Sequence, residues 1–297
     1  MSELPYVLPT YRRSIAAAPP AAGAAAATRR ARLLVCALCV LLPNEITAQA
    51  TPHPLPARTA AGVNTEVASL IARGDKASAA RQPLQALALY EQALDRDSLS
   101  FDALWRASRE SVDLGEFEPD RKKQAERYAR ADRYARQALA LHPDDADVHF
   151  HVARAIGRTA MSVSPRDRVK YAVQVRAHAL EALELNPRHA GALHVMGVWN
   201  AEVMRLNGIA RAFAKAFMGG KVMSTASWEE AARYLDETVE LEPNRLVHRL
   251  DQARIYRDMG RKADARAAFE AALRAPLLDA NDDRYRRAAE DELKALR

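Results

Sequence analysis

From about residue 64 onward, small and apolar residues recur at helical spacing, with charged residues between them. A small residue is followed four positions later by an aromatic or apolar one, and three positions after that usually by alanine. A proline ends most of these segments, because proline lacks the backbone N–H that a continuing helix needs. We therefore predict packed amphipathic helices of one repeated type rather than a sheet. The pattern occurs at Ala86/Tyr90/Ala93, Ala131/Ala135/Ala138, Val175/Ala179/Ala182, Ala231/Leu235/Thr238 and Ala265/Phe269/Ala272.

These positions are those of the tetratricopeptide repeat (TPR), a helix–turn–helix unit of about 34 residues. Upstream of several copies, a matching first helix carries Gly74, Gly197 or Ala253 where two antiparallel helices must approach closely. We predict an all-α fold, a TPR α-solenoid of about five helix pairs over residues 64–276. One amphipathic capping helix, residues 282–297, covers the last apolar face. An ordinary helical bundle is the alternative.

The predicted repeats are longer than the regular unit in the middle of the array. The distances between their ends predict insertions of about 11, 10 and 22 residues in repeats two, three and four, between the two helices of each. We therefore expect inserted helices or loops within the solenoid. The first helices of repeats two to five are expected to begin at residues 101, 146, 190 and 246.

The N-terminal segment has the pattern of a targeting sequence. A basic stretch at residues 28–32 precedes ten apolar residues, 33–42, and a small–x–small ending at Ala50. These are the three parts of a secretory signal peptide, and ten residues are too few to cross a bilayer, which takes about 20. We predict cleavage after Ala50 and an exported protein, periplasmic or secreted. A membrane anchor formed by an uncleaved N-terminal segment is the alternative.

Removal of this leader changes the composition. The 297-residue chain has a formal net charge of +6, and residues 1–50 hold both cysteines, Cys36 and Cys39, with five arginines and two glutamates. The mature chain would have a charge of +3 and no thiol, so neither nucleic-acid binding nor a disulfide framework is indicated. We predict an N-terminal extension with signal peptide at 1–50, a linker at 51–63 and the TPR solenoid domain at 64–297.

The mature chain resembles one protein family, the regulator of microtubule dynamics proteins, over nearly its whole length. The resemblance implies a non-enzymatic repeat protein; eukaryotic members associate with microtubules and organelle membranes. We carry over the fold and the character of a binding scaffold, and not the microtubule partner. The matching segments are Gly115-Glu116-Phe117, residues 192–197, residues 212–217, Glu229-Glu230-Ala231 and Ala275-Pro276-Leu277.

Motifs for catalysis or metal binding are missing from the sequence. It has no HExxH, no glycine-rich phosphate loop and no GxSxG, and its eight histidines are scattered. His149 and His151 are two positions apart, so on a helix they face different directions. We predict no enzymatic activity, no cofactor and no metal site, with the histidines at the surface or in helix seams.

The candidate binding surface is the concave groove, which the first helices of a repeat array line. Positions 5 and 9 of each first helix are expected to point into it. In three of four repeats a large apolar residue precedes an arginine by four positions, so the two share a helix face. Arginine lying over an aromatic ring can bind a carboxylate or a phosphate. The predicted groove residues are Trp105, Arg109, Phe150, Arg154, His194, Val198, Leu250, Arg254 and Arg257.

Our first hypothesis is a non-enzymatic scaffold, acting outside the cytoplasm, that binds an acidic and apolar protein or peptide segment in this groove. The alternative is purely structural: Trp105 and Phe150 pack between helices, and the arginines pair with nearby carboxylates. The carboxylates in question are Asp102, Asp113, Asp147 and Asp258.

The longest insertion supports a second hypothesis, a lipid- or amphiphile-binding module. Apolar side chains fall on one side of a predicted helix, with Arg211 and Lys215 on the other. Residues 204–221 would then form a lid or a membrane-contacting helix, unless they pack as an extra structural helix. The apolar residues are Leu206, Ile209, Phe213 and Phe217.

Overall fold

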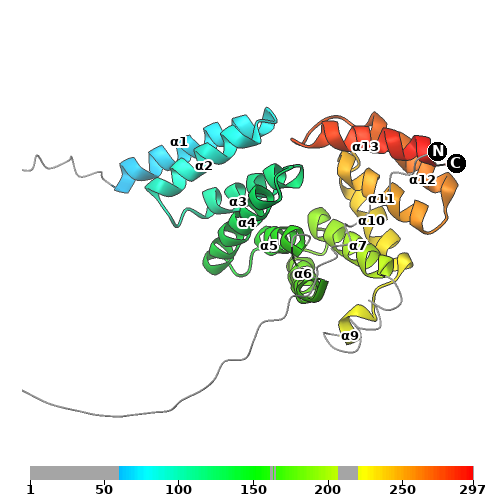
Figure 1. Cartoon of the computed structure of the whole chain (residues 1–297). Helices are drawn as coiled ribbons and strands as arrows, with labels where there is room; N and C mark the ends of the chain where they lie inside the picture. Colours follow the sequence, from blue (N-terminus) through cyan, green and yellow to red (C-terminus); the bar gives the residue numbers. More distant parts are fainter. Residues whose placement is uncertain (1–59, 161–162, 164, 207–219, 297) are drawn as a thin grey trace, which may run out of the picture. The chain divides into compact units, whose positions relative to one another are not determined.

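The computed structural model describes residues 60–160, 163, 165–206 and 220–296 (Figure 1). Every regular element in this part of the chain is a helix. The predicted leader and most of the predicted linker lie outside the described residues. None of the helices described is both long and apolar enough to cross a membrane.

The helices form five successive pairs, which Figure 1 shows as adjacent coils of neighbouring colour. The first helices are α1 (Ala60–Ala79), α3 (Phe101–Glu116), α5 (Ala146–Ala160), α7 (Ala190–Arg205) and α11 (Leu246–Asp258). The second helices are α2 (Pro83–Arg96), α4 (Arg121–Leu141), α6 (Pro165–Leu185), α10 (Trp228–Leu241) and α12 (Lys262–Arg274). The short α9 (Gly220–Met223) precedes α10, and α13 (Asp282–Ala295) follows the last pair. Each second helix also contacts the next first helix, or α13 at the end, which confirms the predicted TPR solenoid.

The repeated small and apolar residues form the seams of this stack. All fifteen residues of the five repeat tails are buried, and every one except Val175, which is 7% exposed, is fully buried. The seams are tight: a Cβ atom on Gly197 would lie 1.7 Å from Cδ2 of Leu235, and one on Gly74 would lie 2.4 Å from Cε1 of Tyr90. The first helices of repeats two to five begin at the four predicted residues. α1 begins at Ala60, inside the predicted linker.

Two of the three predicted insertions do not form separate elements. Four residues separate α3 from α4 and four separate α5 from α6, while α4 and α6 are 21 residues long, against 14 in α2 and in α10. The prediction of extra segments between the helices of repeats two and three is therefore wrong. α4 contains neither glycine nor proline, and α6 contains only the proline at its first position, Pro165. No residue therefore interrupts either second helix, and each continues further than in a regular repeat. In repeat four, α9 does lie within the insertion.

The predicted capping helix is present as α13, which packs on α11 and α12. Its Tyr285, Ala289 and the following Leu296 are buried in one cluster with Phe269 of α12. The helix therefore covers the apolar face that the last repeat would otherwise expose, as the end of a repeat array requires.

Candidate functional site

The predicted groove residues lie on four first helices, α3, α5, α7 and α11. Each of these helices contacts the first helix of the neighbouring pair, so their residues belong to one continuous surface. We call this surface the first-helix face. It carries Trp105 and Arg109 on α3, Phe150 and Arg154 on α5, His194 and Val198 on α7, and Arg254 and Arg257 on α11; the ninth predicted residue, Leu250 of α11, is fully buried.

Trp105 forms the aromatic part of the first-helix face. Its half-buried ring stacks on His151, with the ring centroids 5.3 Å apart and the planes at 20°. The guanidinium carbons of Arg106 and Arg109 lie 4.2 and 5.5 Å from the centroid of the indole ring. Burial lowers the pKa of His151 to about 3, so this imidazole is neutral near pH 7. The structure therefore shows arginine over an aromatic ring in this repeat.

Phe150 and Leu250 serve mainly in packing. Phe150 lies against Gly191, where an added Cβ would approach its Cε2 to 2.7 Å, and its ring centroid is 5.1 Å from that of His189. It thus fills the seam between α5 and α7. Leu250 is fully buried within the cluster around α11 and α12, so its predicted place in an open groove is not what the structure shows. Being near the end of the array, α11 is packed on by both α12 and α13, which covers this side chain.

The arginines of α3 and α5 are paired with carboxylates. Nη2 of Arg109 lies 2.8 Å from Oε1 of Glu110, whose side chain is only 2% exposed. Nη2 of Arg154 lies 2.5 Å from Oδ1 of Asp113, one of the carboxylates named by the structural alternative. Burial disfavours the charged guanidinium of Arg154, but Asp113 and Glu116 outweigh this and raise its pKa. Whether this part of the face also binds a ligand stays a prediction.

Two of the three arginines of α11 hold a carboxylate from another element. Nη2 of Arg254 lies 2.6 Å from Oε1 of Glu292, and Nη1 of Arg257 lies 2.6 Å from Oε2 of the same carboxylate. Glu292 belongs to α13, so a carboxylate of another helix is already bound at this end of the first-helix face. Sequence reasoning missed Glu292, because no local pattern links it to arginines 35 and 38 positions earlier. Arg257 also pairs with Asp258, as the structural alternative proposed.

His194 takes part in a hydrogen-bonded chain between α7 and α11. Its Nδ1 lies 2.9 Å from Nδ1 of His248, and its Nε2 lies 3.3 Å from Oδ2 of Asp251. His248 in turn bonds through Nε2 to Glu242 at 2.9 Å, while burial lowers its pKa to about 4. These histidines connect two repeats. Among the residues that the structure describes, no group of three or more histidine, cysteine or acidic side chains is arranged to hold a metal ion.

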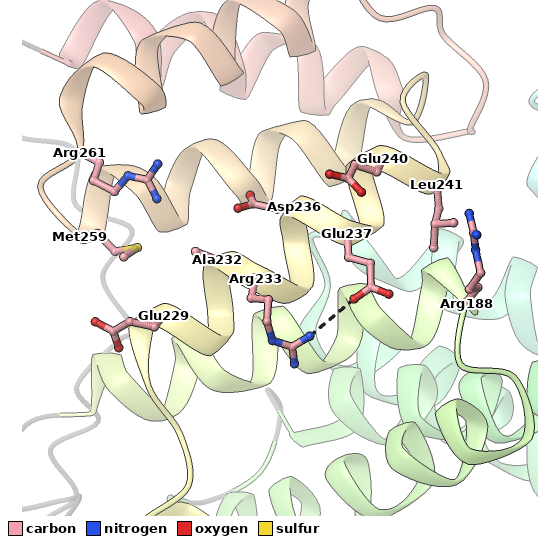
Figure 2. Close-up of a pocket in the computed structure, with 10 residues that line it drawn as sticks. All are labelled: Arg188, Glu229, Ala232, Arg233, Asp236, Glu237, Glu240, Leu241, Met259 and Arg261. Carbon is pink, nitrogen blue, oxygen red and sulfur yellow. Dashed lines mark ion pairs between the residues drawn. The ribbon is translucent and has the colours of Figure 1, made fainter.

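A charged hollow of about 750 Å³ lies along α10, between the α6–α7 turn and the α11–α12 turn (Figure 2). Arg233 at its centre pairs with Glu230 at 2.8 Å and with Glu237 at 3.5 Å, and Asp236 accepts a hydrogen bond from Tyr256 at 2.5 Å. Sequence reasoning passed over this hollow, although five acidic residues among the 14 of α10 marked it. The residues that line it, none of them from the predicted groove, are Arg188, Glu229, Ala232, Arg233, Asp236, Glu237, Glu240, Leu241, Met259 and Arg261.

The predicted lipid-contacting residues fall mostly outside the described residues. Leu206 alone among them is described; it is half-buried and follows the last residue of α7. Ile209, Phe213 and Phe217 lie in the part of the chain that the structure does not describe, so the lid hypothesis stays a prediction.

Comparison with known proteins gives two kinds of similarity. The profile of the family described as regulator of microtubule dynamics protein 1-3 matches residues 70–297. Regulator of microtubule dynamics protein 1 of Mus musculus is 28% identical over 151 residues, 50% of this chain and 48% of that protein. Protein 3 of Mus musculus is 22% identical over 191 residues, 64% of this chain and 40% of that protein. The chain thus spans about half the length of the curated relatives it matches.

Among solved structures, a thermophilic TPR protein of Thermus thermophilus is similar. Its TM-score is 0.54 at 21% sequence identity, and the match covers 75% of this chain and 98% of that one. At this identity the similarity supports the TPR fold alone.

Proposed function

The chain belongs to the family of regulator of microtubule dynamics proteins 1–3, and from that premise we propose that it is a non-enzymatic scaffold binding another protein on its first-helix face. The TPR fold supports the scaffold role, because stacked helix pairs create an extended surface suited to protein segments. The names of the relatives refer to microtubule dynamics. From these relatives we take only the character of a binding protein. The kind of partner we infer from the chemistry of the first-helix face.

The observation that carries this proposal is the binding of Glu292 by two arginines. A planar guanidinium and a carboxylate make strong, geometrically specific hydrogen bonds. Arg254 and Arg257 take one carboxylate oxygen each, and Arg254 donates both through Nε, at 2.9 Å, and through Nη2. This pairing supports the proposal that the first-helix face binds a carboxylate presented by a helix of the partner.

At the α3 end of the first-helix face, an aromatic ring offers a contact for apolar residues of the partner. Trp105 is half-buried, with Arg106 and Arg109 beside its ring. An apolar side chain can pack on the indole, while a neighbouring carboxylate meets the arginines. The partner we propose is thus a segment that alternates acidic and large apolar residues.

Selection from a peptide display library tests this proposal. The purified protein should enrich peptides that carry acidic and large apolar residues together, and Arg254→Glu with Arg257→Glu should weaken their binding at least tenfold, since a charge-assisted pair contributes about 1.5–3 kcal/mol. A control with the same charge change, Lys123→Glu with Arg133→Glu on exposed positions of α4, should leave affinity unchanged.

Two results would contradict the proposal. One is enrichment of basic or purely apolar peptides, and the other is equal loss of binding in the α4 control. Native mass spectrometry provides a separate check: a lipid that co-purifies with the protein would instead support the amphiphile-binding alternative.

We also propose that the scaffold acts outside the cytoplasm, after removal of residues 1–50. N-terminal sequencing of material recovered from the exported fraction should begin at Thr51, because signal peptidase cleaves after a small–x–small sequence. Replacement of Ala48 and Ala50 by leucine should block that cleavage. Exported protein that still begins at Met1 would contradict the proposed leader.

A further inference from the structure

The start of α13 contacts the first two repeats, although these lie far away in the sequence. Nδ2 of Asn281 donates to the carbonyl oxygen of Asp113 at 3.0 Å, and Nη1 of Arg284 donates to that of Phe117 at 3.3 Å. Arg81, in the turn between α1 and α2, donates to the carbonyl oxygen of Asp279 at 3.2 Å and forms an ion pair with Asp283. We call this group of contacts the latch: Arg81, Asp113 and Phe117 on one side, Asp279, Asn281, Asp283 and Arg284 on the other.

An aromatic contact lies beneath the latch. The rings of Phe117 and Tyr285 meet edge to face with their centroids 5.5 Å apart, and Tyr285 is 9% exposed. Burial and the nearby Glu116 raise the pKa of Tyr285 well above its usual value. Glu116 in turn pairs with Arg158 of α5 at 2.5 Å. Tyr285 therefore lies beside a charged pair that joins α3 and α5.

Arg81 has the place in the α1–α2 turn that Gly260, with a φ of +77°, has in the α11–α12 turn. Its φ is +60°, the left-handed region that glycine adopts without cost and that costs other residues about 1 kcal/mol or more. A glycine here would remove the strain and would also remove the side chain that reaches α13. The position thus bears a strained backbone while presenting a guanidinium to Asp279 and Asp283.

The two halves of α13 are held in different ways. The C-terminal half packs through Ala289 and Leu293, with Leu296 beyond it, in the apolar cluster of α11 and α12. The N-terminal half is held by the buried Tyr285, which belongs to the same cluster, and by the polar contacts of the latch, whose partners Asp283 and Arg284 are exposed. Exposed ion pairs and hydrogen bonds contribute about 1 kcal/mol each or less, so the latch contacts are the weaker part of what holds α13.

We propose that α13 is a displaceable occupant of the first-helix face, and that an amphipathic helix of a partner competes with it. This inference rests on the proposed function and names the partner more closely. In α13, Tyr285 and Glu292 are seven positions apart and therefore lie on one side of the helix. The partner helix carries the same pair, an aromatic residue and a carboxylate seven positions later, preceded by an acidic residue that meets Arg81.

A fluorescein-labelled peptide with the sequence of residues 279–296 tests the competition by fluorescence anisotropy on the full chain. The latch variant, Asp283→Ala with Arg284→Ala, removes side chains of α13 only. It weakens the contacts that hold α13 in place and does not change the surface that receives the peptide. It should bind the peptide about tenfold more tightly than the unmodified protein. The apparent affinity rises with the fraction of molecules in which α13 has left its place. Adding Arg81→Ala to the latch variant should remove most of this gain.

The matched control makes the same two substitutions on exposed positions of the same helix, Arg287→Ala with Asp291→Ala. It should bind the peptide as weakly as the unmodified protein. Equal, measurable affinity in all three proteins would overturn the latch and leave the scaffold proposal standing. Binding by none of them would also overturn the latch, and the display selection, which does not use the α13 peptide, then decides the scaffold proposal by itself.

Discussion

Replacement of Gly197 by valine should lower the free energy of unfolding by about 3 kcal/mol or more, at the upper end of what overpacking costs. A Cβ atom at this position would lie 1.7 Å from Cδ2 of Leu235 and 3.2 Å from the carbonyl oxygen of Ala231. The second contact is with backbone, so rotation of the leucine alone cannot make room. The pair α7–α10 would have to separate. Urea unfolding followed by circular dichroism at 222 nm measures the loss.

Gly157 provides the matched control for this prediction. It also lies within a first helix, but the nearest atom to an added Cβ is Cγ2 of Val175 at 3.7 Å, an ordinary contact. Gly157→Ala should therefore stabilise the protein by about 0.5–1 kcal/mol, the gain in helix propensity. If Gly197→Val unfolds at the same urea concentration as the unmodified protein, the close approach of α7 and α10 is wrong.

Replacement of Phe269 by alanine should cost about 3–5 kcal/mol, the range for a large aromatic residue deleted from a core. Phe269 is fully buried in the cluster that joins α11, α12 and α13. The cavity would lie directly beneath the cap, so the amides of α13 should also exchange hydrogen faster. Thermal unfolding and hydrogen exchange measure the two effects.

Leu84 provides the control for Phe269. Its side chain is 66% exposed on α2, and Leu84→Ala should change stability by less than about 0.5 kcal/mol. A loss for Phe269→Ala no larger than that for Leu84→Ala would mean that the last repeat is not packed as the structure has it.

The repeat positions could be predicted from the sequence because each reflects a local packing demand. A glycine or alanine facing an aromatic or leucine recurs wherever two helices of a pair cross, as Gly74 does with Tyr90. The spacing of prolines, by contrast, shows only where repeats end. It cannot tell an inserted segment from a longer helix, which is why α4 and α6 were predicted as shorter helices with insertions.

The contacts of the first-helix face were only partly predictable. Asp113 and Asp258 were named as possible arginine partners, and both pair with predicted groove arginines, Arg154 and Arg257. The capping role of α13 was predicted, but its contacts with Arg81, Asp113 and Phe117 were not foreseeable, because they depend on how five repeats place two distant segments. Leu250 was misplaced for the same reason, since periodicity does not show what covers the last first helix.

The central claim is that the first-helix face is where this protein binds a partner. Hydrogen–deuterium exchange, measured with and without a peptide obtained by display selection, tests it most directly. We expect slower exchange in α3, α5 and α11 and faster exchange at the start of α13, where the latch is displaced. Protection confined to α10 and the hollow around Arg233, with the first helices unchanged, would contradict the account.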